Sequence, residues 1–148
     1  MAYLGIPQNT IAVLQKYHFN FQKKFGQNFL IDTTVLDRII SSAEITKEDC
    51  VLEIGPGIGT MTQYLAERAG SVVAVEIDKA LLPILKETLQ DYDNVTVIND
   101  DILKVDINRL VEEKNGGRHR SLWDFLRRMF LWIPLRLWYR KRLQTVCR

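Results

Sequence analysis

Apolar positions along residues 33–99 change between helix-like and strand-like spacing. Thr33–Ala43 repeats apolar residues every three to four positions, which is typical of an amphipathic helix. Short β-rich runs occupy Cys50–Ile54, Ser71–Ile77 and Asn94–Ile98, and helical spacing returns at Thr60–Ala69 and Lys79–Gln90. Strands that alternate with helices through short links predict parallel pairing with right-handed crossovers. The expected fold class is therefore α/β.

The C-terminal segment 118–148 differs sharply in composition from the rest. Residues 1–117 hold 11 Lys/Arg and 17 Asp/Glu, whereas residues 118–148 hold 9 Lys/Arg and a single acid. All three tryptophans also lie in this last segment, so the net charge of +2 hides two unlike regions. We expect a boundary near Gly116-Gly117, with a basic Trp- and Arg-rich tail that is not part of the α/β fold.

Length and composition narrow the class of protein. A chain of 148 residues allows one domain of ordinary size. No apolar run approaches the ~20 residues that span a bilayer, and the N-terminus does not have the pattern of a signal peptide. Cys50 and Cys147 lie too far apart in sequence to indicate a metal site or a disulfide framework. We therefore expect a cytoplasmic protein with no metal and no membrane span.

A glycine-rich turn follows the first predicted strand and precedes a helix. Its glycines are Gly55, Gly57 and Gly59, and glycine lets a backbone turn tightly and approach a ligand. Ligands of open α/β sheets bind at the carboxyl ends of the strands, where this turn lies. A tight turn without a ligand is the alternative interpretation.

Acidic residues follow the next two predicted strands. Glu76 stands 21 residues after Gly55, a distance at which an acid accepts hydrogen bonds from ribose hydroxyls. Asp101 follows the third strand, where it could meet an adenine amino group. Solvent-exposed strand-end or loop carboxylates are the alternative for both. We expect Asp78 to cap the helix that follows it.

The spacing of the glycines bears on which cofactor the turn accepts. A dinucleotide fingerprint has glycine at its first, third and sixth positions, and the sixth position here is Thr60. Glu53, two residues before the first glycine, fits the pattern of S-adenosylmethionine (SAM) methyltransferases better. SAM is therefore favoured over NAD.

Three stretches together resemble the ribosomal RNA adenine N6-dimethyltransferases, and the small-subunit enzymes more than the macrolide-resistance methylases. These stretches are KFGQNFLID (24–32), EIGPGIGTMT (53–62) and VVAVEID (72–78). The resemblance covers roughly residues 10–117. It implies an incomplete Rossmann-like SAM-dependent methyltransferase fold, with the first three strands in residues 33–117 and an N-terminal arm in residues 1–32.

The resemblance also implies roles for particular residues and a partner. Gln27, Asn28 and Leu30 would line the cofactor pocket, the three glycines would pass the methionine part of SAM, Glu76 would hold the ribose and Asp101 the adenine. Ribosomal RNA of the small subunit would be the substrate. Cationic and aromatic residues of the arm would lie near this RNA; they are Lys16, Tyr17, Phe19, Phe21, Lys23 and Lys24. An amphipathic arm packed on the domain is the alternative for this stretch.

The catalytic tetrad of the resembled family, of the type Asn-Leu-Pro-Tyr, does not occur in the sequence. It would position the target adenine for in-line methyl transfer. The four prolines, at positions 7, 56, 83 and 134, do not stand in such a context, and no catalytic residue is assigned. We interpret segment 118–148 as the product of a reading-frame shift; a functional basic tail or a solvated one are the alternatives.

Three functions are compatible with these observations. The first is SAM-dependent N6,N6-dimethylation of adenine in small-subunit ribosomal RNA. The second, favoured for the chain as printed, is a SAM-binding fragment without turnover. The third is a basic module that binds RNA or a membrane surface through its tail.

Overall fold

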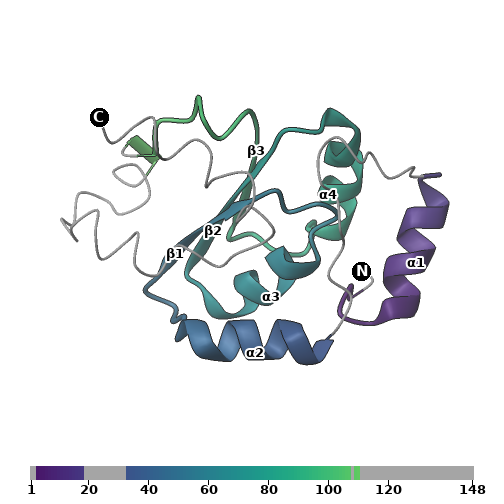
Figure 1. Ribbon diagram of the computed structural model, residues 1–148, viewed down its shortest axis with the longest axis horizontal. Helices are drawn as coiled ribbons and strands as arrows, with labels where there is room; N and C mark the ends of the chain where they lie inside the picture. The colour runs from purple at the N-terminus through teal and green to yellow at the C-terminus, as the bar shows by residue number, and fades with distance from the viewer. Residues whose placement is uncertain (1–2, 19–32, 108, 111–148) are drawn as a thin grey trace, which may run out of the picture.

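The computed structural model describes residues 3–18, 33–107 and 109–110. Their elements, in chain order, are α1 (Pro7–Lys16), α2 (Thr33–Ala43), β1 (Cys50–Ile54), α3 (Thr60–Arg68), β2 (Ser71–Glu76), the 3-10 helix η2 (Lys79–Leu81), α4 (Leu82–Thr88) and β3 (Val95–Asn99). This order confirms the predicted alternation of strands and helices. Figure 1 shows the sheet with the helices gathered beside it.

The sheet is parallel, as the sequence predicts, and β2 is its middle strand. Val51 of β1 pairs with Val72 of β2, and Val72 pairs in turn with Val95 of β3. Since successive side chains of a strand point to opposite faces, these three valines lie on the same face of the sheet. The three strands are aligned so closely that their carboxyl ends meet at one edge.

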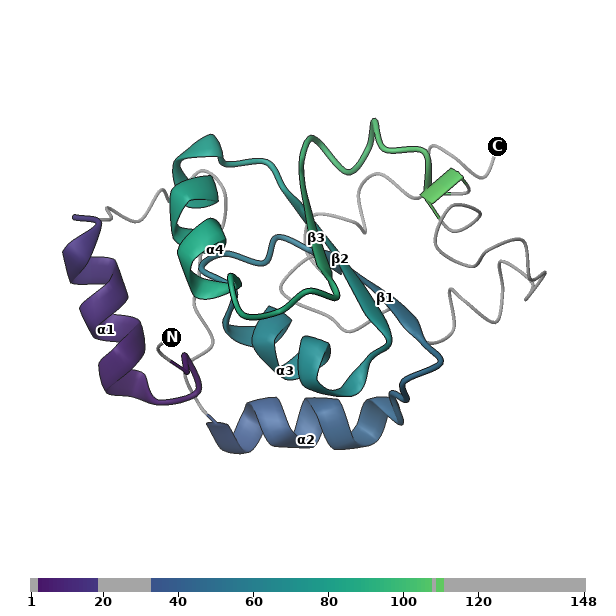
Figure 2. The same cartoon turned by 180° about the vertical axis from the view of Figure 1, so that it is seen from behind.

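The face of the sheet that carries Val51 and Val72 is covered by α3 and α2. One core cluster joins these valines to Leu36 and Ile40 of α2 and to the buried apolar residues of α3. The α3 helix is nearly surrounded by protein, since all its residues from Thr60 to Ala66 are buried. Figures 1 and 2 both show α2 running alongside α3.

The helix α1 packs outside α4 and extends the same layer (Figure 2). Leu4 and Val13 join a second cluster with Ile84 and Leu85 of α4. Leu4 is fully buried, so the N-terminal segment is an integral part of the fold. This helix was not predicted from the sequence.

The opposite face of the sheet is covered by the chain that follows β3. Leu52, Val73 and Val75 form the buried centre of this third cluster. Four apolar residues from 102–110 pack against it, namely Ile102, Val105, Ile107 and Leu110. The described part of the chain thus places helices on one face and this connection on the other.

The observed boundaries differ from the predicted ones by small amounts. The region predicted as one helix, Lys79–Gln90, consists of η2 followed by α4. Asp78 caps η2, because its Oδ1 atom accepts a hydrogen bond from the Ala80 N–H at 3.0 Å, as predicted. Pro83 lies in the first turn of α4, where its missing N–H does least harm.

Candidate functional site

The glycine turn connects β1 to α3 in a backbone conformation that requires glycine. Gly55, Gly57 and Gly59 have φ angles of +71°, +62° and +92°, all in the left-handed region. The Gly55 N–H donates to the Val75 carbonyl at 2.9 Å, which ties the turn to β2. A Cβ atom on Gly55 would meet no atom of the described residues within 4 Å, so these residues leave the space above this part of the turn open.

Glu76 is the last residue of β2 and holds this turn from the neighbouring strand. Its Oε2 atom accepts from the Gly57 N–H at 3.2 Å, and its Oε1 atom accepts from the Asp78 N–H at 2.8 Å. Only 4% of the residue is exposed. Burial raises the pKa of this carboxyl, and the two backbone hydrogen bonds oppose the rise. The side chain is therefore fixed at the strand end beside the glycines.

A second buried carboxyl, that of Glu53, lies near Glu76 at the carboxyl end of β1. Glu53 is 7% exposed, and its Oε2 atom has no hydrogen-bond partner among the described residues. Burial raises its pKa to about 7; the nearby Thr62 hydroxyl opposes the rise, and the charge of Glu76 adds to it. The Thr62 hydroxyl lies outside hydrogen-bonding geometry with this carboxyl, and the Thr60 hydroxyl is equally buried and unpartnered in the described part of the chain. Three polar atoms next to the turn thus have no hydrogen-bond partner within residues 3–18, 33–107 and 109–110.

Asp101 follows β3 at the same edge of the sheet. Its Oδ1 atom accepts from the Leu103 N–H at 3.0 Å, which shapes the turn after the strand. Asn99 lies opposite Glu76 in the sheet register and donates from Nδ2 to the Glu76 carbonyl at 2.6 Å. The glycine turn, Glu76 and Asp101 are therefore collected along one edge by the parallel strands.

Two exposed apolar residues at this edge were missed by the sequence analysis. Ile77 directly follows Glu76 and is 50% exposed, and Leu103 lies two residues after Asp101 and is 46% exposed. Large apolar side chains beside polar strand ends offer van der Waals surface to an aromatic ring. The sequence does contain one signal for Ile77, because this residue directly follows the acid predicted to end the second strand.

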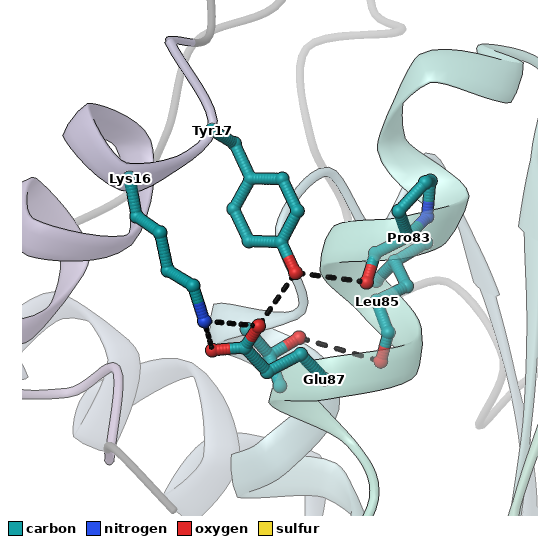
Figure 3. A network of polar contacts seen from close by, with 6 residues as sticks. Lys16, Tyr17, Pro83, Leu85 and Glu87 are labelled. Atoms are coloured by element: carbon teal, nitrogen blue, oxygen red, sulfur yellow. Dashed lines mark hydrogen bonds and ion pairs between the residues drawn. The ribbon is translucent and has the colours of Figure 1, made fainter.

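Lys16 and Tyr17, predicted to lie near RNA, are joined to α4 by Glu87 (Figure 3). The Lys16 Nζ atom lies 2.7 Å from both carboxylate oxygens, and the Tyr17 hydroxyl donates to Oε2 at 2.5 Å. The hydrogen bond from Lys16, followed by that from Tyr17, lowers the pKa of Glu87. We call this contact the α1–α4 clamp.

The remaining predicted site residues lie outside the described residues. They are Gln27, Asn28 and Leu30 of the predicted cofactor pocket and Phe19, Phe21, Lys23 and Lys24 of the predicted RNA contact. The tail 118–148 lies outside them as well. Within the described ranges, no group of three or more His, Cys, Asp or Glu could hold a metal ion. No helix in these ranges is long and apolar enough to cross a membrane.

The fold and the strand-end site define the class of protein. The structure is similar to that of the 23S rRNA methyltransferase ErmE, with a TM-score of 0.50 and 42% identity over 53% of this chain and 32% of that chain. The fold is accordingly a partial Rossmann-like domain of the kind found in SAM-dependent methyltransferases. The sequence matches the family model for ribosomal RNA adenine dimethylase over residues 18–137. The chain belongs to this family.

Curated relatives support the same assignment. The chain is 74% identical over 119 residues to ribosomal RNA small subunit methyltransferase A of Lachnoclostridium phytofermentans, covering 80% of this chain and 41% of the relative. It is 56% identical over 116 residues to the protein of the same name from Alkaliphilus oremlandii, covering 78% and 40%. The chain thus spans about two fifths of the length of these relatives. The family match includes part of segment 118–148, and the boundary near Gly117 stays a prediction.

Proposed function

We propose that this chain binds SAM at the carboxyl edge of its sheet, as the cofactor-binding part of an enzyme that dimethylates adenine in small-subunit ribosomal RNA. Family membership supports the reaction class, and the relatives' printed name supports the small subunit as the source of the RNA. A cytoplasmic location among ribosomes follows from this substrate. Bound SAM would supply an activated methyl group on its sulfonium.

The observation that carries the cofactor is the pair of buried carboxyls beside the glycine turn. Glu53 and Glu76 are both more than nine-tenths buried, and the Glu53 Oε2 atom is unpartnered among the described residues. Buried acids disfavour an anionic ligand, and a bound cation would favour the charged form of Glu53, whose pKa of about 7 lets it exist in either form near neutral pH. SAM carries a sulfonium and an ammonium against one carboxylate, so it is a net cation, whereas NAD would bring an anionic pyrophosphate to the same turn. The charge of the site therefore supports SAM.

Glu76 has the geometry to hold the ribose of this cofactor. Each of its carboxylate oxygens already accepts one backbone N–H. A carboxylate offers about four acceptor positions, so both ribose hydroxyls can still donate to it. Asp101 would accept from the adenine amino group, and Ile77 and Leu103 would contact the adenine ring. The space that the described residues leave open above Gly55 would have room for the methionine part.

Cofactor binding, rather than methyl transfer, is the activity to measure on the chain as printed. The 148 residues do not contain the family's catalytic tetrad. We therefore expect the pure chain to bind S-adenosylhomocysteine and to transfer no methyl group to ribosomal RNA. Methyl transfer by the pure chain would contradict this second expectation and leave the site assignment standing.

The test compares Glu76→Gln with a charge-matched control by isothermal titration with S-adenosylhomocysteine. Hydrogen bonds to a charged group contribute about 1.5–3 kcal/mol, so Glu76→Gln should weaken binding by about 10- to 100-fold. Glu67→Gln removes an acid that is 42% exposed on α3 and should leave the affinity unchanged. NAD should not bind the wild type. Failure of the wild type to bind S-adenosylhomocysteine, or equal affinities of the two variants, would contradict the proposal.

A further inference from the structure

The glycine turn is held from behind by the last residue of α4. The Thr88 Oγ1 atom donates to the Ile58 carbonyl at 2.8 Å, and Ile58 lies between Gly57 and Gly59. Both side chains are inaccessible, with Thr88 1% and Ile58 0% exposed. The second acceptor of this hydroxyl, the Leu85 carbonyl, is farther away at 3.5 Å. The shorter bond indicates that Thr88 is directed at the turn.

Gln63 connects Thr88 to the N-terminal segment, residues 3–17. This glutamine of α3 is fully buried, and its Nε2 atom donates to the Thr88 carbonyl at 2.7 Å. Its Oε1 atom accepts from the Leu4 N–H at 2.8 Å. Thr10 of α1 closes the path, because its Oγ1 atom donates to the Leu4 carbonyl at 2.9 Å. A continuous buried hydrogen-bond path, which we call the Gln63–Thr88 bridge, thus leads from α1 to the glycine turn.

Close packing of Gly59 against the end of α4 supports the same connection. A Cβ atom on Gly59 would lie 3.2 Å from both the Thr88 Oγ1 atom and the Leu89 Cδ2 atom. Glycine populates many backbone conformations, so the glycines alone do not select one shape for the turn. The contacts with α4 supply this selection. Buried polar contacts are suited to it, because an unmade hydrogen bond in such a place is costly.

We propose that Thr88 and Gln63 are positioning residues that couple the docking of the N-terminal segment to the shape of the cofactor-binding turn. The proposal rests on the proposed function, because the turn must bind the cofactor for its shape to matter. Loosening the bridge at Thr88, or farther away at Thr10, weakens cofactor binding through the turn. The effect passes along the described contacts and needs no contact between these side chains and the cofactor.

The experiment uses the full chain and measures its affinity for S-adenosylhomocysteine together with its melting temperature. Thr88→Val keeps the shape of the side chain but removes the donor to Ile58, and Thr88→Ser keeps the donor. Perturbations along such networks change affinity by about 2- to 30-fold, so we expect Thr88→Val to bind at least about threefold more weakly. We expect Thr88→Ser to retain the affinity of the wild type.

Ile40→Val is the control, because Ile40 is buried in the cluster of α2, α3 and the sheet and takes no part in the Gln63–Thr88 bridge. It should lower the melting temperature without changing the affinity. Thr10→Val, at the far end of the bridge, should weaken binding in the same direction as Thr88→Val and keeps the test open if Thr88→Val does not fold. If the wild type binds S-adenosylhomocysteine, and Thr88→Val and Thr10→Val bind it with the same affinity as the wild type, the proposed role of the Gln63–Thr88 bridge is wrong. Absence of binding by the wild type would instead contradict the proposed function.

Discussion

Glu76 accepts a hydrogen bond from the Gly57 N–H at 3.2 Å, so the end of β2 is tied directly to the turn that follows β1. The two residues are 19 positions apart, and the parallel pairing of β1 with β2 brings them together. The residue that is proposed to hold the ribose therefore also holds the turn that is proposed to pass the methionine part of SAM. A change at Glu76 should disturb both functions at once.

Glu76→Asp tests the charge of the side chain separately from its length. It keeps the carboxylate but shortens the side chain by one methylene, so the carboxylate can no longer hold the Gly57 N–H and the ribose together. We expect the affinity for S-adenosylhomocysteine, measured by isothermal titration, to fall by about tenfold or more. Wild-type affinity in Glu76→Asp would show that charge alone suffices and that the hydrogen bond to Gly57 has no part in binding.

Alanine at Gly55 and at Gly59 should have unequal effects on stability. Both positions have positive φ angles, which cost a residue with a Cβ about 1–2 kcal/mol. At Gly59 the new Cβ would also press on Thr88, Leu89 and Leu85, and overpacking adds about 1–3 kcal/mol. Urea unfolding should show the larger loss for Gly59→Ala. Equal losses would mean that α4 does not pack closely on the turn.

Glu53→Gln should change how stability depends on pH. Burial raises the pKa of Glu53 from 4.5 to about 7 in the folded protein. A carboxyl whose pKa is higher in the folded state stabilises that state fully at pH values below its pKa in the unfolded chain. This stabilisation is lost as the pH rises through its pKa in the folded protein. Between pH 4.5 and pH 8 this loss amounts to roughly 3 kcal/mol in the wild type.

The variant does not undergo this loss. Its free energy of unfolding, relative to that of the wild type, should therefore increase from pH 5 to pH 8. Urea unfolding of both proteins at the two pH values measures the difference. The pKa shift of Glu87 cancels in this comparison, because both proteins contain it unchanged, whereas the interaction of Glu53 with Glu76 is part of the measured difference. A difference that does not vary with pH would show that Glu53 is ionised in the folded state across this range.

Glu87→Gln should loosen the α1–α4 clamp. The lowered pKa of Glu87 means that its contribution to stability is present above the ordinary carboxyl value and is lost as the pH falls through the folded value. We expect a small fall in melting temperature at neutral pH and low salt, which disappears at about 1 M salt because exposed charges are then screened. Glu67→Gln, whose ion pair with Arg68 is 3.9 Å long, is the control and should not show this salt dependence.

Spacing and turn chemistry were enough to predict most of the fold. The three strands are short β-rich runs that end at glycine or acidic residues, and all three are present. By contrast, α1 was not predicted, because its buried residues Thr10 and Val13 give only a weak apolar stripe. This helix is stabilised by packing on α4, and tertiary packing of this kind is not visible in local sequence.

The part of the candidate site that lies at the ends of the strands could be predicted from the sequence. Gly55, Gly57, Gly59, Glu76 and Asp101 meet at one edge because parallel strands end together. The burial of Gln63 could not be foreseen, since a glutamine in a helix is usually exposed. Its role depends on contacts with Leu4 and Thr88, which are 59 and 25 positions away in sequence.

Binding of SAM at the carboxyl edge of this sheet can be tested by NMR, with titration of the isotopically labelled full chain with S-adenosylhomocysteine. We expect saturable shifts of the amide signals of Gly55, Gly57 and Gly59, together with those of Ile77 and Asp101. Shifts confined to segment 118–148, or an unchanged spectrum at millimolar ligand, would exclude binding at this edge.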